Sequence, residues 1–134
     1  MALTKSDYEK YTYWIEMSEY DIGAAQAMLD SKRYLYVGFM CHQAIEKALK
    51  AIFVRDCSPE TLPYIHNLAK LADTSGIYTK MTDEQKDFLD ELGPLNVEAR
   101  YPEEKDKFFA RMTPDYCESL LSMTKELFEW LKTN

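Results

Sequence analysis

Glycine and proline are scarce in this sequence, with four glycines and five prolines among 134 residues. They fall between periodic segments, and no Gly/Ser linker, internal repeat or low-complexity tract divides the chain. A chain of this length with 46% hydrophobic residues can bury one core without disulfides or metals. We therefore expect a single domain over residues 1–134.

Cysteine and histidine, which serve as metal ligands and as catalytic residues, are also few. The three cysteines, Cys41, Cys57 and Cys117, are far apart and lack a C-x-x-C spacing, which excludes a disulfide framework and a zinc site of that type. The two histidines, His42 and His66, cannot supply a three-histidine metal site, and no Glu-x-x-His pair supports a di-metal bundle. Local motifs for dinucleotides, for phosphate loops and for zinc proteases are absent. We expect no metal, no cofactor and no self-contained catalytic motif.

Positive charge is in deficit, because 16 lysines and arginines stand against 23 acidic residues, for a net charge of -7. This balance opposes non-specific attraction to phosphate backbones and makes a general nucleic-acid coat protein a poor interpretation. The start of the chain lacks an apolar signal core, and the longest apolar run, YLYVGFMC, is far shorter than the ~20 residues of a membrane span. We expect a soluble, cytoplasmic protein that does not enter a membrane.

Apolar residues recur at three- and four-residue steps along most of the chain, which predicts helices over about 7–29 and 34–56. A short helix over about 65–75 is ended by Gly76, and the capping box of Thr82 and Gln85 begins another at 83. That helix meets Gly93-Pro94, after which LNVEA adds a further turn. Thr113 caps the last helix. With no strand-like alternation, the sequence predicts an all-α fold, an antiparallel up-and-down four-helix bundle with a short additional helix.

Two groups of polar residues lie where these helices should pack. Asp21, with Ser18, interrupts the apolar face of the first helix, so that Asp21 either reaches a neighbouring helix or opens onto a cleft. The second helix carries a polar stripe on an otherwise apolar surface, formed by His42, Gln43, Glu46, Lys47 and Lys50. Taken as solvated residues, Glu46 and Lys50 form a weak pair, and His42 is a surface or interface residue. His66 is expected to cap or pack at a helix end.

The segment LNVEARYPEEKDKFF places Arg100, Tyr101 and Pro102 where the helical pattern stops. A guanidinium at this position can hold a phosphate with two hydrogen bonds, while an adjacent tyrosine stacks on a base or ribose. The alternative is structural: Arg100 neutralises the negative end of a helix and Tyr101 packs in the core.

Four segments together resemble one family. YWIEMSEYDIGAAQAML, YVGFMCHQAIEKALKAIFV, YIHNLAKLA and NVEARYP occur in the order of the first helix, the second helix, the His-x-Leu segment and the Arg-Tyr-Pro turn of the HEPN domain, the higher eukaryotes and prokaryotes nucleotide-binding domain. The resemblance implies a helical bundle, often a homodimer, with the arginine turn lining a cleft near the dimer interface. Many HEPN proteins are metal-independent ribonuclease toxins paired with a small nucleotidyltransferase.

The sequence departs from the ribonuclease pattern of this family, in which a histidine follows the arginine by four to six residues. The positions after Arg100 read YPEEKDK and contain no histidine. Our first hypothesis is therefore a nucleotide- or phosphate-binding module that partners a nucleotidyltransferase, with a ligand site formed by Asp21, His42, Glu46, Lys47, Arg100 and Tyr101. The second is a ribonuclease toxin with an altered site around Arg100, acting on RNA through His42 or His66. The third is a structural bundle that serves only protein contacts.

Overall fold

The chain is helical throughout the residues that the computed structural model describes, which are 5–57, 64–98 and 105–134, and these residues contain no strand. The elements are α1 (Lys5–Asp30), α2 (Tyr34–Asp56), α3 (Leu68–Ser75), the 3₁₀ helix η1 (Tyr78–Lys80), α4 (Asp83–Glu98), α5 (Lys105–Arg111) and α6 (Pro114–Thr133). The predicted all-α class and helical bundle are confirmed. None of the described helices is long and apolar enough to cross a membrane.

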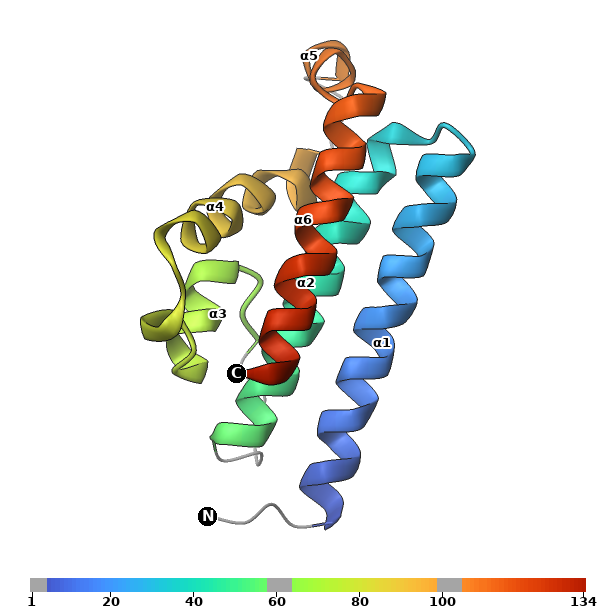
Figure 1. Cartoon of the computed structure of the whole chain (residues 1–134). Helices are drawn as coiled ribbons and strands as arrows, with labels where there is room; N and C mark the ends of the chain where they lie inside the picture. The colour runs from blue at the N-terminus through green and yellow to red at the C-terminus, as the bar shows by residue number, and fades with distance from the viewer. Residues whose placement is uncertain (1–4, 58–63, 99–104) are drawn as a thin grey trace.

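Three long helices lie side by side, with α1 running in the opposite direction to α2 and α6 (Figure 1). The helices α3 and α4 lie to one side of these three, where α4 crosses obliquely, and α5 lies at the end of the bundle where α6 begins (Figure 1). The central helix is α2, which contacts α1, α3, α4, α5 and α6. This position explains why α2 is apolar on nearly every side except its polar stripe.

Contact between α2 and α4 depends on the absence of a side chain at Gly38. A Cβ atom built there would lie 2.9 Å from Cδ1 and 3.3 Å from Cβ of Leu95, and 3.1 Å from Cε of Met112. Leu95 and Met112 are themselves buried. Gly38 therefore allows α4 and the segment after α5 to approach the backbone of α2 closely.

The predicted helix ends are formed by side chains in the expected way. In the capping box before α4, the Thr82 N–H donates to Gln85 Oε1 at 2.9 Å, and the Gln85 N–H donates to Thr82 Oγ1 at 3.1 Å. Thr113 Oγ1 accepts from the Tyr116 N–H at the start of α6, and Gly76 ends α3 with a φ of 86°. The short helix begins at Leu68 rather than near 65, because Asn67 is its cap and accepts from the Lys70 N–H.

Two features of the α4–α5 region differ from the sequence prediction. The helix α4 continues through Pro94 to Glu98 as one element, so residues 95–98 are part of it. Because Pro94 has no N–H, the intrahelical bond to the Asp90 carbonyl cannot form, and Gly93 reduces the clash that proline imposes on the residue before it. The second feature is α5, which was not predicted; it is short, but its Phe108 is buried in the core.

Two glycines inside helices should respond oppositely to substitution. Gly38→Leu is expected to lower the free energy of unfolding by about 1–3 kcal/mol, because the new side chain overlaps Leu95 and Met112. Gly23→Ala is expected to raise it by about 0.5–1 kcal/mol, because Gly23 lies in α1 with open space around a built Cβ and alanine favours helix. Urea unfolding followed by circular dichroism measures both values. Wild-type stability in Gly38→Leu would contradict the close approach.

Candidate functional site

A polar stripe runs along the central helix α2. Its members Gln43, Glu46, Lys47 and Lys50 recur at steps of three and four residues and so share one face. Each side chain in the stripe makes a polar contact, and three of these contacts reach other parts of the chain. The stripe is therefore an internal surface on which α1, α4 and the segment before α3 meet α2.

The contact with α1 is an ion pair between Lys47 and Asp21. Lys47 Nζ lies 2.6 Å from Asp21 Oδ2, and both side chains are largely buried. One turn earlier on α1, Ser18 Oγ donates to the Ala44 carbonyl at 2.6 Å. Of the two roles open for Asp21 in the sequence, the structure shows the first: it reaches a neighbouring helix, and Ser18 does the same.

Glu46 is the centre of a second polar contact. Its side chain is only 4% exposed, and its two oxygens contact Lys50 Nζ at 3.2 Å and His66 Nδ1 at 3.1 Å. The sequence treated Glu46 and Lys50 as a solvated pair; this is wrong, because the carboxylate lies under the segment that leads into α3. His66, with its side chain 50% exposed, packs at a helix end as expected. Asn67, rather than His66, caps that helix.

Asn96, which the sequence reading missed, joins α4 to the same stripe. Gln43 Nε2 donates to Asn96 Oδ1 at 2.9 Å, across 53 residues of sequence. A signal for Asn96 was present, since it falls one helical turn before Arg100 in LNVEAR. Its partner, however, depends on the packing of α4 against α2, which sequence spacing alone does not give.

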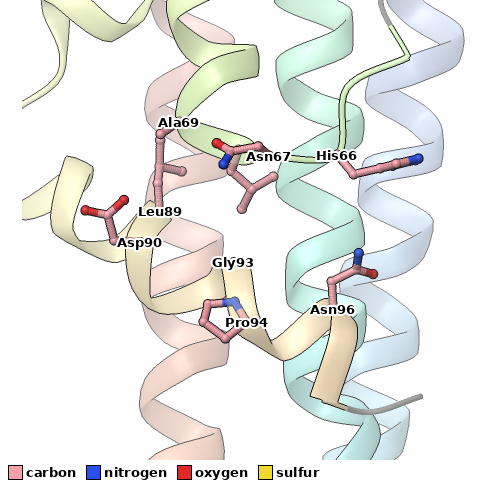
Figure 2. A pocket seen from close by; sticks show the side chains of 9 residues that line it. His66, Asn67, Ala69, Leu89, Asp90, Gly93, Pro94 and Asn96 are labelled. Atoms are coloured by element: carbon pink, nitrogen blue, oxygen red, sulfur yellow. The ribbon is translucent and has the colours of Figure 1, made fainter. Parts of the chain in front are cut away.

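A pocket of about 400 Å³ opens beside these contacts, between α3 and the second half of α4. It is lined by His66, Asn67, Leu68, Ala69, Leu89, Asp90, Gly93, Pro94 and Asn96. Figure 2 shows His66 and Asn96 on the side of the pocket near α2, with Asp90 on the other side. His66 and Asn96 thus line the pocket and also contact the polar stripe, so the pocket and the stripe form one site.

The other three predicted ligand residues are His42, which is buried and does not line the pocket, and Arg100 and Tyr101, which are not among the described residues. His42 is 1% exposed, which corrects the expectation of a surface residue. Its position on the edge of the stripe is covered because α2 is surrounded by five helices. Arg100 and Tyr101 lie outside the described residues, which stop at Glu98 and resume at Lys105. The structure therefore brings together Asp21 with Lys47 and Glu46 with His66, and it removes His42 from the accessible wall.

Protein families and solved structures show what this chain resembles. A family model described as the HEPN domain matches residues 11–134. The chain belongs to the HEPN domain family. Among solved structures, the crystal structure of TT1696 from Thermus thermophilus is similar, with a TM-score of 0.78 and 18% identity over 92% of this chain and 97% of that chain. At this identity the likeness concerns the fold alone. No curated protein matched the chain.

The described part of the candidate site has hydrogen-bonding capacity but little net charge. Asp21 and Glu46 offset Lys47 and Lys50, and Asp90 in the pocket wall adds one negative charge, so these residues provide no excess positive charge. The amides of Asn67 and Asn96, the imidazole of His66 and the carboxylate of Asp90 present donors and acceptors suited to a heterocycle or a sugar. Among the described residues, no cluster of three His, Cys, Asp or Glu side chains is arranged to hold a metal ion.

The buried cysteines of the HEPN domain are unsuited to nucleophilic chemistry. Burial raises the pKa of the Cys41 thiol to about 11, and burial also raises the pKa of Cys117 to about 11. Both thiols therefore stay protonated near neutral pH, where a nucleophilic cysteine must be a thiolate. Cys41 and Cys117 are small core residues of the bundle.

Replacing the buried carboxylate tests how far the site depends on it. Glu46→Gln is expected to lower the free energy of unfolding by about 1–3 kcal/mol, because Lys50 and His66 lose a charged acceptor in a poorly solvated position. Glu129→Gln is the matched control: Glu129 pairs with Lys132 on the exposed surface, where such a pair contributes about 0–1 kcal/mol. Chemical denaturation of the two variants and wild type measures the difference. Equal stabilities would show that the Glu46 contacts are not stabilising.

Proposed function

We propose that this HEPN domain binds a nucleotide or another phosphate-bearing ligand in the pocket beside the polar stripe. The observation that carries the proposal is the double connection of this pocket to α2, through His66 with Glu46 and through Asn96 with Gln43. These contacts fix two hydrogen-bonding groups on the wall before a ligand arrives, which reduces the ordering cost of binding. The volume of about 400 Å³ lies within the range of about 300–1,000 Å³ common for ligand pockets.

In this proposal the phosphate is held mainly by Arg100 and the base or ribose lies against Tyr101. This assignment of the phosphate to Arg100 is supported by the described wall, which offers amide groups and the imidazole of His66 but no lysine or arginine. Lys47 is already paired with Asp21 at 2.6 Å, so Asp21 orients Lys47. Neither residue lines the pocket, so the pair acts on the ligand without touching it. His42, which is buried, is assigned a packing role instead.

The proposal extends to assembly: the domain forms a homodimer and pairs with a minimal nucleotidyltransferase in a toxin–antitoxin-like system. Support for a protein interface comes from α1, where Tyr13 and Tyr20 are 56% and 74% exposed and lie seven residues apart on one helix face. Exposed tyrosines are enriched at protein interfaces, since they bury much area at low entropic cost. The nucleotidyltransferase partner rests on family resemblance.

Thermal unfolding in the presence of nucleotides tests the binding site. Millimolar ATP or GTP is expected to raise Tm of the wild type, because a ligand that prefers the folded state stabilises it. At about 100 times Kd the gain is about 2.7 kcal/mol, or on the order of 10 °C for a chain of this size. The rise should disappear in Arg100→Ala and in Ala69→Leu, which places a larger side chain in the pocket.

Matched controls separate the site from general effects of charge and volume. Arg33→Ala removes one positive charge from the exposed turn between α1 and α2, and Ala27→Leu enlarges an exposed alanine on α1. Both should keep the full Tm rise. Loss of the rise in Arg100→Ala but not in Ala69→Leu would place the ligand outside the pocket. No rise with any nucleotide would contradict the proposed function, and sedimentation equilibrium of the same samples tests the dimer.

A second candidate function is an RNA-cleaving toxin, favoured by the contact between His66 and Glu46. The imidazole is half-exposed at the pocket, while the carboxylate that contacts it is almost completely buried. A carboxylate in this position orients the ring, as in general acid–base catalysis. His66 would then move the proton of a ribose 2′-hydroxyl while Arg100 stabilises charge at phosphorus.

The ribonuclease hypothesis predicts that expression of the wild type arrests growth and degrades cellular RNA. Arg100→Ala and His66→Asn should each abolish arrest, whereas His42→Asn should act only through any loss of stability. Growth curves, RNA gels and protein levels at matched expression measure these effects. Normal growth with intact RNA at high wild-type levels would eliminate this function and leave the binding module.

A further inference from the structure

A second hollow lies at the other end of α4, between its first turns and the second half of α6, and encloses about 260 Å³. Its floor is apolar, with Phe88 from α4 and Met123, Leu127 and Trp130 from α6. Glu84 and Glu126 stand at its edge. We call these six residues the acidic groove. Met123 is 38% exposed there, which is high for an apolar residue beside a core.

The two carboxylates of the acidic groove are not neutralised by ion pairs within residues 5–57, 64–98 and 105–134. The lysines nearest in sequence are directed elsewhere. Lys86 lies over the ring of Tyr78 at 4.7 Å, and Lys125 donates to Gln26 at 3.1 Å. Two unneutralised acids beside the exposed Met123 and the partly exposed Trp130 offer an external cation both charge and contact area.

We propose that the acidic groove receives an arginine side chain from a basic amphipathic helix of a partner protein. The groove is smaller than the ~300 Å³ lower limit of ordinary small-molecule pockets but can hold one long side chain. The aliphatic stem lies on Met123, and the guanidinium lies between the carboxylates and the face of Trp130. Thioether side chains adapt to such partners, and helix-in-groove binding uses this type of surface.

Charge complementarity selects a basic partner over a second copy of this chain. Each copy carries a net charge of -7, so association of two copies at an acidic surface is opposed, while a basic helix is attracted. The groove is formed by residues that do not line the pocket of about 400 Å³. The inference therefore stands whether or not that pocket binds nucleotides.

Titration with two synthetic helical peptides tests the groove. Both carry leucine on one face; the other face carries arginine in one peptide and glutamate in the second. We expect the full chain to bind only the arginine peptide in calorimetry. Glu84→Gln/Glu126→Gln should weaken binding by about tenfold or more, because the paired charges face one cation. Met123→Lys, which places a competing ammonium in the groove, should have a similar effect.

The control Glu9→Gln/Glu16→Gln removes the same charge from exposed positions on α1 and should change affinity less than about twofold, since distant exposed charges are screened by salt. Equal losses in the two double variants would overturn the groove in favour of general attraction. Absence of binding by the arginine peptide would overturn it as well. Free arginine that binds as tightly as the peptide would replace the docking helix with a small-molecule site.

Discussion

A buried carboxylate on the central helix governs the arrangement around the candidate site. Glu46 is almost removed from water, and an unpaired charge there would destabilise the fold by several kcal/mol, on the order of the stability of a small domain. One oxygen contacts Lys50 on its own helix, which needs no tertiary structure. The other contacts His66, which lies outside α2, and this contact ties the segment before α3 to the bundle. Together with the buried Leu68 and Leu71 of α3, this contact fixes one wall of the pocket.

The shape of α4 supplies the other wall. Gly38 allows Leu95 to approach α2, so the second half of α4 is held against the central helix, where Asn96 meets Gln43. The pair Gly93 and Pro94 lies just before this contact and faces the pocket. An added Cβ at Gly93 would meet nothing within 4 Å, which shows open space on that side. The helix crosses the bundle obliquely (Figure 1), with the pocket beside its second half and the acidic groove beside its first turns.

Local patterns were sufficient to predict most helices because their causes are local. The spacing of apolar residues predicted α2 over residues 34–56, as observed, and the caps at Thr82, Gly76 and Thr113 formed as expected. The failures have tertiary causes. Helix α4 passes Pro94 because packing of Leu95 on α2 compensates for the lost hydrogen bond. His42 is buried because several helices surround α2, a fact that the periodicity of one helix does not contain.

The candidate site shows the same division between local and tertiary information. Helical spacing predicted that Glu46 and Lys47 share a polar stripe, but it did not predict their partners, since His66 lies 20 residues from Glu46 and Asp21 lies 26 from Lys47. These partners change the chemistry: Lys47, which the sequence predicted as a ligand residue, is already paired with Asp21 in the fold, and Lys50 is paired with Glu46. Attraction for phosphate must then come from groups outside these pairs. In the proposed binding site that attraction comes from Arg100, and the stripe on α2 holds the wall against which the ligand lies.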